Sequence, residues 1–201
     1  MTQPTLTPLA PGATEANEAP ALLALPCWHA CIGLGGNLGD VLASMVAALG
    51  AVHTLPGTRV VSVSSVYETA PVDASGPNFL NAVAVLATSL GPHELLRALQ
   101  ALELAQGRER AYRNAPRTLD LDLLCHGDAL LDTPTLTLPH PRMAERAFVL
   151  QPLREALADL PTSPAAAGGC LPTLPGEAEQ AKMACAQGIA RQCGFPVNFR
   201  I

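Results

Sequence analysis

Short apolar runs recur along the middle of the chain. "WHACIGL" (28–34) and "FLNAVAVLATS" (79–89) are bounded by turn residues and predict strands. "RVVSVSSVYET" (59–69) alternates between apolar and polar positions and predicts another strand. The polar positions between these runs then decide where helices begin and end.

Two segments are flanked by residues that favour the start or the end of a helix. "VLASMVAALGAVH" (41–53) follows Asp40, whose carboxylate is placed to cap a helix. "PHELLRALQALELAQG" (92–107) opens with Pro92, which suits a first helical turn, and closes with Gly107, which suits a helix stop. We therefore predict a helix in each segment.

The remaining middle of the chain holds an arginine-rich loop (108–117), a strand (119–125), a short strand near 129–131 and one or two short helices before residue 160. The order β-α-β-β-α-β is typical of a ferredoxin-like α/β sandwich. The predicted class is α+β, with a mainly antiparallel sheet and flanking helices, which we expect on one face of the sheet.

The tails differ in composition from the middle. Residues 1–26 are rich in Pro, Ala and Thr and predict a disordered N-terminal arm before a domain at 27–160. Residues 161–201 form a Pro/Ala/Gly-rich C-terminal extension, with a flexible linker first and one weak helix within 177–191.

Composition narrows the function classes. The 201 residues are 49% hydrophobic and 14% charged, and the net charge of -5 gives no electrostatic reason to expect nucleic acid or an anionic membrane as partner. The first basic residue is Arg59, so a signal peptide or presequence would lack its charges, and no apolar run approaches a membrane span. We expect a cytoplasmic protein without an obligate protein partner. Six cysteines without a C-x-x-C pair predict free thiols.

The most unusual segment is "NAPRTLDLDLL" (114–124). Asp120 and Asp122 share one face of the predicted strand, because side chains alternate with a period of two. Two carboxylates suit Mg²⁺ with substrate phosphates, which nearby arginines can bind: Arg108, Arg110, Arg113 and Arg117. The alternative is a solvated edge strand that forms a salt bridge with the last of these arginines.

The glycine-rich segment "GLGGNLGD" (33–40) resembles a dinucleotide-binding loop. A dinucleotide-binding loop requires an acid about 20 residues further on, and no acid lies between Val41 and Tyr67. We interpret the segment as a tight strand-to-helix turn whose backbone approaches a ligand. A nicotinamide-dependent oxidoreductase built on these glycines remains an alternative.

Three further positions are candidates. Glu103 lies on the apolar arc of its helix with Gln100 beside it, although it can also lie at the arc's edge and reach solvent. Phe79 and Asn81 share a strand face and suit a flat heterocycle, or they are a core ring and an amide near a turn. His140, between two prolines, is as readily structural as functional.

"RNAPRTLDLDLL" resembles the signature of 6-hydroxymethyl-7,8-dihydropterin pyrophosphokinase, a folate-pathway family. Five other segments agree in order with this family over about residues 28–160: "IGLGGNLGD", "SSVYETAPV", "PNFLNAVAVL", "LELAQGRER" and "LTLPHPRMAERAFVLQPL". The resemblance implies a ferredoxin-like fold and transfer of the β,γ-diphosphate of ATP, with two Mg²⁺ ions, to the pterin hydroxymethyl group.

The resemblance also implies residue roles. Asp120 and Asp122 correspond to the metal ligands, and Arg108 and Arg117 to arginines that act on the phosphates. The residues that it assigns to the nucleotide are Gln100, Glu103, Arg110, Thr137, His140 and Arg146. Those that it assigns to the pterin are Thr69, Val72, Phe79, Asn81 and Phe148, with the two aromatic rings on either side of the heterocycle.

The sequence departs from the family pattern at Thr135, where a basic residue is frequent, and at Pro141, where an aromatic is frequent. The loop 108–117 is one residue shorter than in some relatives. A non-catalytic ferredoxin-like binding module is the third alternative, and pterin-dependent formation of AMP from ATP separates it and the oxidoreductase from the pyrophosphokinase.

Overall fold

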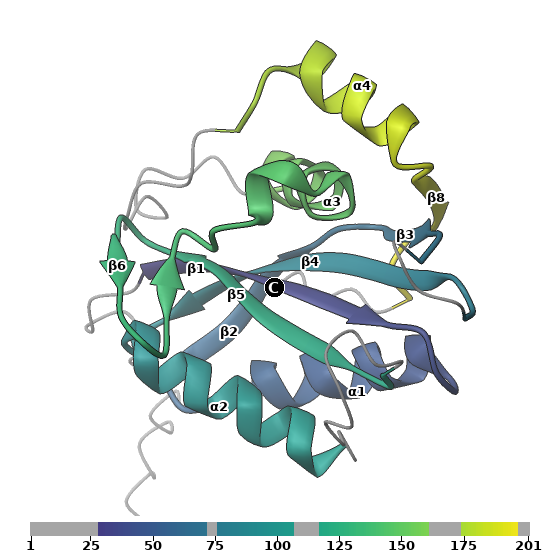
Figure 1. Ribbon diagram of the computed structural model, residues 1–201. Coiled ribbons are helices and arrows are strands. Elements are labelled where there is room, and N and C mark those ends of the chain that lie inside the picture. Colours follow the sequence, from purple (N-terminus) through teal and green to yellow (C-terminus); the bar gives the residue numbers. More distant parts are fainter. Residues whose placement is uncertain (1–27, 72–75, 107–116, 161–173, 197–201) are drawn as a thin grey trace, which may run out of the picture.

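An antiparallel sheet runs through the centre of the protein, which is seen here in a computed structural model (Figure 1). The structure describes residues 28–71, 76–106, 117–160 and 174–196. Within these ranges the main sheet has six strands in the order β5-β1-β4-β3-β8, and β2 pairs with β4 beside β3. Every strand pair is antiparallel. The predicted α+β class is confirmed.

The strands of the main sheet are β1 (Trp28–Gly36), β2 (Thr58–Val63), β3 (Val66–Thr69), β4 (Phe79–Thr88), β5 (Asp120–His126) and β8 (Ala190–Cys193). A small separate hairpin consists of β6 (Leu131–Asp132) and β7 (Thr137–Leu138). The helices are α1 (Val41–His53), α2 (Pro92–Ala105), the 3-10 turn η2 (Met143–Glu145), α3 (Ala147–Ala158) and α4 (Glu177–Ala186).

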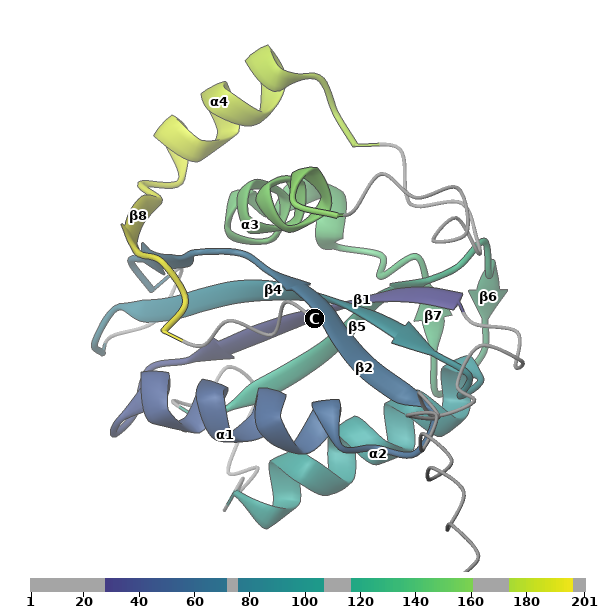
Figure 2. The same ribbon diagram turned by 180° about the vertical axis from the view of Figure 1, so that it is seen from behind.

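Helices cover both faces of the sheet, so the expectation of helices on one face is wrong. Helices α1 and α2 lie on one face, and α3 lies on the other with α4 beyond it (Figures 1 and 2). The cause is visible in β4, where Ala82 and Ala84 pack in the α1/α2 core and Val83 and Val85 pack in the α3 core. β4 is apolar at every position from Ala82 to Ala87, and such a run must be buried on both sides of the sheet.

The helix ends follow local chemistry. The Asp40 carboxylate accepts a hydrogen bond from the Ala43 backbone N–H at 3.0 Å, which is the predicted cap of α1. Pro92 is the first residue of α2. Helix α2 ends at Ala105, and the predicted stop at Gly107 lies outside the described residues.

The segment predicted as one strand at 59–69 forms two strands. The break falls at Ser64, whose hydroxyl donates to the Ser65 carbonyl at 2.7 Å and accepts from the Val83 N–H at 3.0 Å. A serine side chain that bonds to nearby backbone competes with the regular ladder. As a result, β2 and β3 pair with different parts of β4.

The glycine segment is also more extended than predicted. Gly35 and Gly36, beyond the predicted strand 28–34, belong to β1 rather than to the turn, which begins at Asn37. A Cβ atom on Gly36 would lie 2.5 Å from the Thr118 carbonyl oxygen, so any side chain there would collide with the backbone that leads into β5. This glycine lets the two segments meet.

The C-terminal extension adds to the domain. The predicted weak helix forms α4, and the chain then turns back so that β8 pairs with β3, a strand that the sequence did not predict. The linker expected from residue 161 lies outside the described residues as far as residue 173. Among the helices of the described ranges, none combines the length and apolar character needed to cross a membrane.

Candidate active site

Two adjoining clefts open on the α3 side of the sheet and beside β5. The larger has a volume of about 620 Å³ and the smaller about 320 Å³. Asp122 and His140 line both clefts, so the two spaces meet at these side chains. A ligand in one cleft therefore lies next to a ligand in the other.

The larger cleft is hollow because the sheet lacks side chains beneath it. In β1, Ala30, Ile32 and Leu34 pack in the α1/α2 core, so the alternate positions Gly33 and Gly35 face α3. Neither glycine projects a side chain, and the backbone itself forms the floor. The space that α3 would otherwise fill against a side chain is left for a ligand.

Strand β5 carries the two carboxylates to this floor. Asp122 pairs with Gly33 and Asp120 with Gly35, and both aspartates line the larger cleft. Leu121 lies between them and packs in the opposite core. The predicted placement of both acids on one strand face is confirmed. Because side chains alternate along β5, burying the leucines in the opposite core turns both aspartates toward the cleft.

The charges of this site are unevenly balanced. An Arg117 guanidinium nitrogen lies 2.6 Å from an Asp120 carboxylate oxygen. Burial raises the pKa of the Asp122 carboxyl above its ordinary value, and the nearby charge of Asp120 raises it further, against the opposing effects of His140 and two arginines. Burial also lowers the pKa of His140. The carboxylate pair is thus suited to bind a cation.

Glu103 supports the carboxylate strand from the other side. Its side chain is only 3% exposed, and its carboxylate accepts a hydrogen bond from the Leu121 N–H at 2.7 Å. The alternative of a solvent-reaching residue at the edge of the helix is therefore wrong. The bond fixes the backbone between Asp120 and Asp122, and Glu103 also lines the smaller cleft.

Groups suited to a flat polar ring also line the larger cleft. Asn81 is 6% exposed and donates from its amide to the Thr69 hydroxyl at 3.0 Å. Phe79 lines the cleft from β4 and Phe148 lines it from α3. The Arg146 guanidinium carbon lies 5.5 Å from the centre of the Phe148 ring.

Asn37 joins the turn after β1 to the backbone at Arg117 and at Pro77. Its carboxamide oxygen accepts from the Arg117 N–H at 3.0 Å, and its carboxamide nitrogen donates to the Pro77 carbonyl at 3.3 Å. Its own N–H donates to the Arg117 carbonyl at 2.9 Å. The backbone at Arg117, in the segment that leads into β5, is therefore fixed to the turn after β1.

A family model described as 7,8-dihydro-6-hydroxymethylpterin-pyrophosphokinase (HPPK) matches residues 31–158. The chain belongs to this family. The family suggested by the sequence resemblance is thus confirmed, and the HPPK match ends at the last residue of α3.

Curated HPPK relatives match the same part of the chain. A 2-amino-4-hydroxy-6-hydroxymethyldihydropteridine pyrophosphokinase of Pseudomonas aeruginosa is 51% identical over 130 residues, which cover 64% of this chain and 80% of that protein. A Bacillus subtilis protein of the same name is 44% identical over 127 residues, covering 63% and 76% of the two chains. Both alignments are shorter than the present chain.

Solved structures show the same fold. Wild-type HPPK-DHPS of Plasmodium falciparum, solved with pteroate, superposes with a TM-score of 0.52 at 13% identity. The superposition covers 67% of this chain and 42% of that longer one. At this identity the likeness concerns the fold of the HPPK domain alone.

The structure brings together most residues that the sequence singled out. Nine line the larger cleft: Thr69, Phe79, Asn81, Arg117, Asp120, Asp122, His140, Arg146 and Phe148. The smaller cleft is lined by Gln100, Glu103, Asp122, Thr137 and His140, and also by Thr135 and Pro141, where the sequence departs from the HPPK pattern. Val72, Arg108 and Arg110 lie outside the described residues.

Sequence reasoning missed two residues, one that lines the larger cleft and one that holds the backbone of Arg117 beside it. Asn37 stands directly after the glycines of β1, and a polar residue at a strand end is a signal that could have identified it. Gln187 lines the larger cleft from the C-terminal extension, 29 residues beyond the end of the family match. No local pattern distinguishes it from other surface glutamines.

Proposed function

We infer that the protein is the pyrophosphokinase of folate biosynthesis that its family and relatives indicate. It transfers the β,γ-diphosphate of ATP to the hydroxymethyl group of 6-hydroxymethyl-7,8-dihydropterin and releases AMP. The observation that carries this inference is the meeting of two clefts at Asp122 and His140. A two-substrate transfer requires two such spaces with charged groups where they join.

The chemistry of the linings supports one substrate for each cleft. The larger cleft offers aromatic rings at Phe79 and Phe148 and an amide at Asn81, which suit a flat heterocycle with donors and acceptors at its edge. The smaller cleft holds Gln100, Thr137 and His140, whose polar groups suit a nucleoside. The triphosphate then extends from the smaller cleft toward Asp122.

The residues present fit Mg²⁺. Asp120 and Asp122 are hard oxygen donors, and no third His, Cys, Asp or Glu joins them in a metal cluster within the described ranges. Mg²⁺ is usually held by one or two carboxylates together with substrate phosphates and water. We propose that these aspartates hold two Mg²⁺ ions on ATP, which would supply charge neutralisation at the phosphates.

The chain itself contributes position and charge. Asn81 and the two phenylalanines orient the pterin so that its hydroxyl oxygen faces the β-phosphorus, and the AMP oxygen leaves from the opposite side. Arg117 and Arg146 line the larger cleft beside the aspartates, where each can stabilise phosphate charge. We propose that Arg108, outside the described residues, acts on the same phosphates.

A direct test measures nucleotide products. The full-length chain is incubated with ATP and Mg²⁺, with and without the hydroxymethyldihydropterin, and the nucleotides are separated. We expect AMP and the pterin diphosphate in equal amounts, only when pterin and Mg²⁺ are both present. Formation of ADP, or AMP formed without dependence on the pterin, would contradict this function.

The nicotinamide alternative has no support in the fold. A dinucleotide-binding glycine loop joins a strand of a parallel sheet to its helix, whereas β1 lies between β4 and β5 and is antiparallel to both. The test above also covers the binding-module alternative, because a module would bind the pterin and form no AMP.

A further inference from the structure

The C-terminal segment 174–196 lies outside the stretch that matches the HPPK family, yet it reaches the larger cleft. Helix α4 packs beside α3, and β8 lies along β3 at the edge of the sheet (Figure 2). Gln187, between α4 and β8, lines the cleft together with Arg146 and Phe148. The segment thus supplies a residue to the site.

The end of α4 fixes the direction of this glutamine. Gln187 is the C-cap of α4, and Gly188 follows with a positive φ of 60°. The Ile189 N–H donates to the Ala184 carbonyl at 3.2 Å and the Gly188 N–H to the Cys185 carbonyl at 3.3 Å. This is the Schellman pattern of helix termination. It reverses the chain toward β8 and leaves the Gln187 side chain facing α3.

The Gln187 carboxamide forms hydrogen bonds with the backbone on both sides of Arg146. Its oxygen accepts from the Ala147 N–H at 2.9 Å, and its nitrogen donates to the Glu145 carbonyl at 2.8 Å. Arg146 stands at the N-cap of α3 and its side chain makes no capping bond, so the first helical N–H obtains an acceptor from a residue 40 positions away. One side chain therefore holds the backbone on both sides of Arg146.

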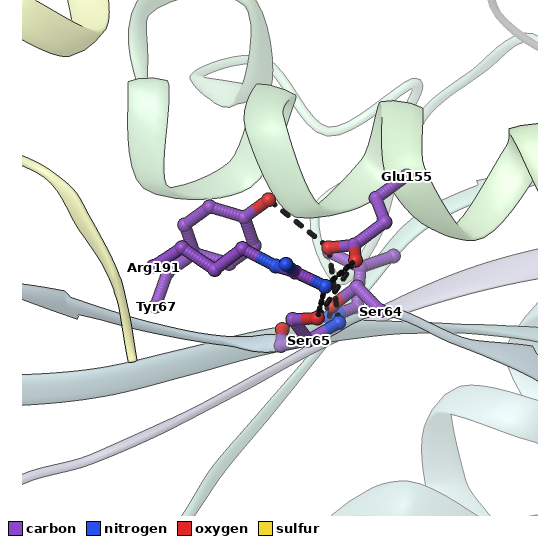
Figure 3. Close-up of polar contacts among 6 residues, drawn as sticks. Ser64, Ser65, Tyr67, Glu155 and Arg191 are labelled. Carbon is purple, nitrogen blue, oxygen red and sulfur yellow. Dashed lines mark hydrogen bonds and ion pairs between the residues drawn. The ribbon is translucent and has the colours of Figure 1, made fainter. Parts of the chain in front are cut away.

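Figure 3 shows how the segment is anchored beyond the cleft. The Glu155 carboxylate, on α3, points to the sheet and accepts from the Ser65 hydroxyl at 2.7 Å, the Tyr67 hydroxyl at 3.0 Å and an Arg191 guanidinium nitrogen at 2.9 Å. The same Arg191 nitrogen lies 2.6 Å from the Ser65 hydroxyl. Arg191 thus joins β8, β3 and α3 at one point.

We propose that Gln187 is a positioning residue of the active site, which holds Arg146 against the phosphate side of the cleft by bonding the backbone on both sides of it. This proposal rests on the proposed function, because it assumes that Arg146 faces ATP. Arg146 lies within electrostatic range of both Asp120 and Asp122, the carboxylates assigned to the metal and triphosphate. A displacement of this arginine weakens the enzyme's contact with the phosphates.

The test replaces Gln187 in the full-length chain. Gln187→Leu keeps the size of the side chain and removes both hydrogen bonds. We expect the KM for ATP to rise about tenfold while the thermal midpoint changes little, since small displacements of a positioning group have large kinetic effects. A partial loss of folded enzyme would lower kcat and leave KM unchanged, so the rise in KM separates positioning from a structural effect.

Gln192→Leu is the matched control. Gln192 has the same chemistry, lies on β8 and bonds to Glu68, but it does not line the cleft. We expect wild-type KM values for this variant. Arg191→Ala releases the anchor without touching the cleft, and we expect it to raise the KM for ATP in the same direction as Gln187→Leu, by a smaller factor.

A double-variant cycle tests the route through Arg146. Once Arg146→Ala has removed the positioned group, Gln187→Leu should change the KM for ATP by less than about twofold. Equal effects of Gln187→Leu in the two backgrounds, or a wild-type KM for the single variant, would overturn the proposal. Failure of the wild-type chain to form AMP in a pterin-dependent manner would instead overturn the proposed function.

Discussion

The two sides of the cleft are held in place by different kinds of structure. On the strand side, Asp120 and Asp122 sit on β5, an edge strand whose register is fixed by pairing with β1, by buried leucines and by the Glu103 hydrogen bond to Leu121. On the helix side, Arg146 and Phe148 sit where η2 meets α3, and the backbone there is held by Gln187 from the C-terminal segment. The strand side lies within the family match, whereas the support of the helix side lies beyond it.

The difference suggests that the two sides of the cleft have different roles. Carboxylates that bind a metal need a rigid backbone, which β5 has through its buried leucines, its pairing with β1 along one edge and the Glu103 hydrogen bond on the other. A wall that contacts substrate can be held by a peripheral segment, because its adjustment changes affinity more than chemistry. Loss of a strand-side carboxylate should therefore affect turnover, and changes on the helix side should affect binding.

The largest effect should come from Asp122→Ala, which removes a proposed metal ligand from the strand side. We expect the rate of AMP formation to fall by at least roughly a thousandfold, or about 4 kcal/mol of barrier, with the thermal midpoint retained. Asp128→Ala, on an exposed turn after β5, is the control and should keep the wild-type rate. Near-normal Mg²⁺-dependent turnover by Asp122→Ala would rule out the metal assignment.

Glu103→Ala tests whether the strand side depends on its buried support. The Leu121 N–H would lose its acceptor, and an unsatisfied buried donor costs about 1–3 kcal/mol of folding stability. We expect a lower thermal midpoint together with a lower rate. Glu103→Gln retains an oxygen that can accept from Leu121, so it should be less harmful on both measures. Equal melting curves for all three chains would show that the bond supports nothing.

Phe79→Ala and Phe148→Ala compare aromatic groups from the two sides. Each ring should contribute about 0.5–1.5 kcal/mol to pterin affinity beyond the area it buries, so each variant should weaken binding by at least about two- to tenfold. Calorimetric titration with a pterin analogue, in the presence of a non-hydrolysable ATP analogue, measures this. If Phe79→Ala bound the pterin with unchanged affinity, the ring would belong to the core instead.

The smallest effect concerns the anchor of the helix side. Burial alone would raise the pKa of Glu155, but hydrogen bonds from Ser65 and Tyr67 and the charge of Arg191 lower it below its ordinary value. A carboxyl with a lowered pKa in the folded state stabilises the protein above its unfolded-state pKa, and this contribution is lost as pH falls through the folded-state pKa. Glu155→Gln should therefore lower the thermal midpoint slightly at neutral pH.

The pH dependence provides the check on that variant. The difference in thermal midpoint between wild type and Glu155→Gln should shrink as pH falls through the acid range, because the wild-type carboxylate becomes protonated. Tyr67 offers a contrast, since burial and the hydrogen bond to Glu155 raise its pKa to about 12 and keep it neutral throughout. A difference that stayed constant down to acid pH would argue against a charged Glu155 as the anchor.

Signals within a few residues of sequence were enough to predict helices α1 and α2 and the strand that carries the two aspartates. The cap at Asp40 and the Pro92 start placed α1 and α2, and alternation placed both aspartates on one strand face, because each signal acts within a few residues. The end of β1 was predicted too early, since Gly35 and Gly36 continue the pairing with β4, and Gly36 also admits the close approach of the Thr118 backbone. That approach depends on a contact across more than 80 residues of sequence.

The helix side was less predictable for the same reason. "ARQC" (190–193) has no apolar alternation, and it forms a strand because the edge of β3 is open to pair with it. The residues "QG" at 187–188 indicate a helix end, but they do not indicate that the glutamine reaches the N-terminus of another helix. Glu155 likewise looks like a surface residue of α3 until β3 and Arg191 surround it.

Strand β8 also changes what the sheet presents to its neighbours. Without it, the outer side of β3 would expose unpaired N–H and C=O groups beside Val66 and Tyr67, and such an edge is a template on which another chain can add a strand. β8 pairs with that side and is itself only four residues long, fully exposed, and charged at Arg191. A short charged edge is a poor template for further pairing, so the extension that supports the active site also protects the protein against edge-to-edge aggregation.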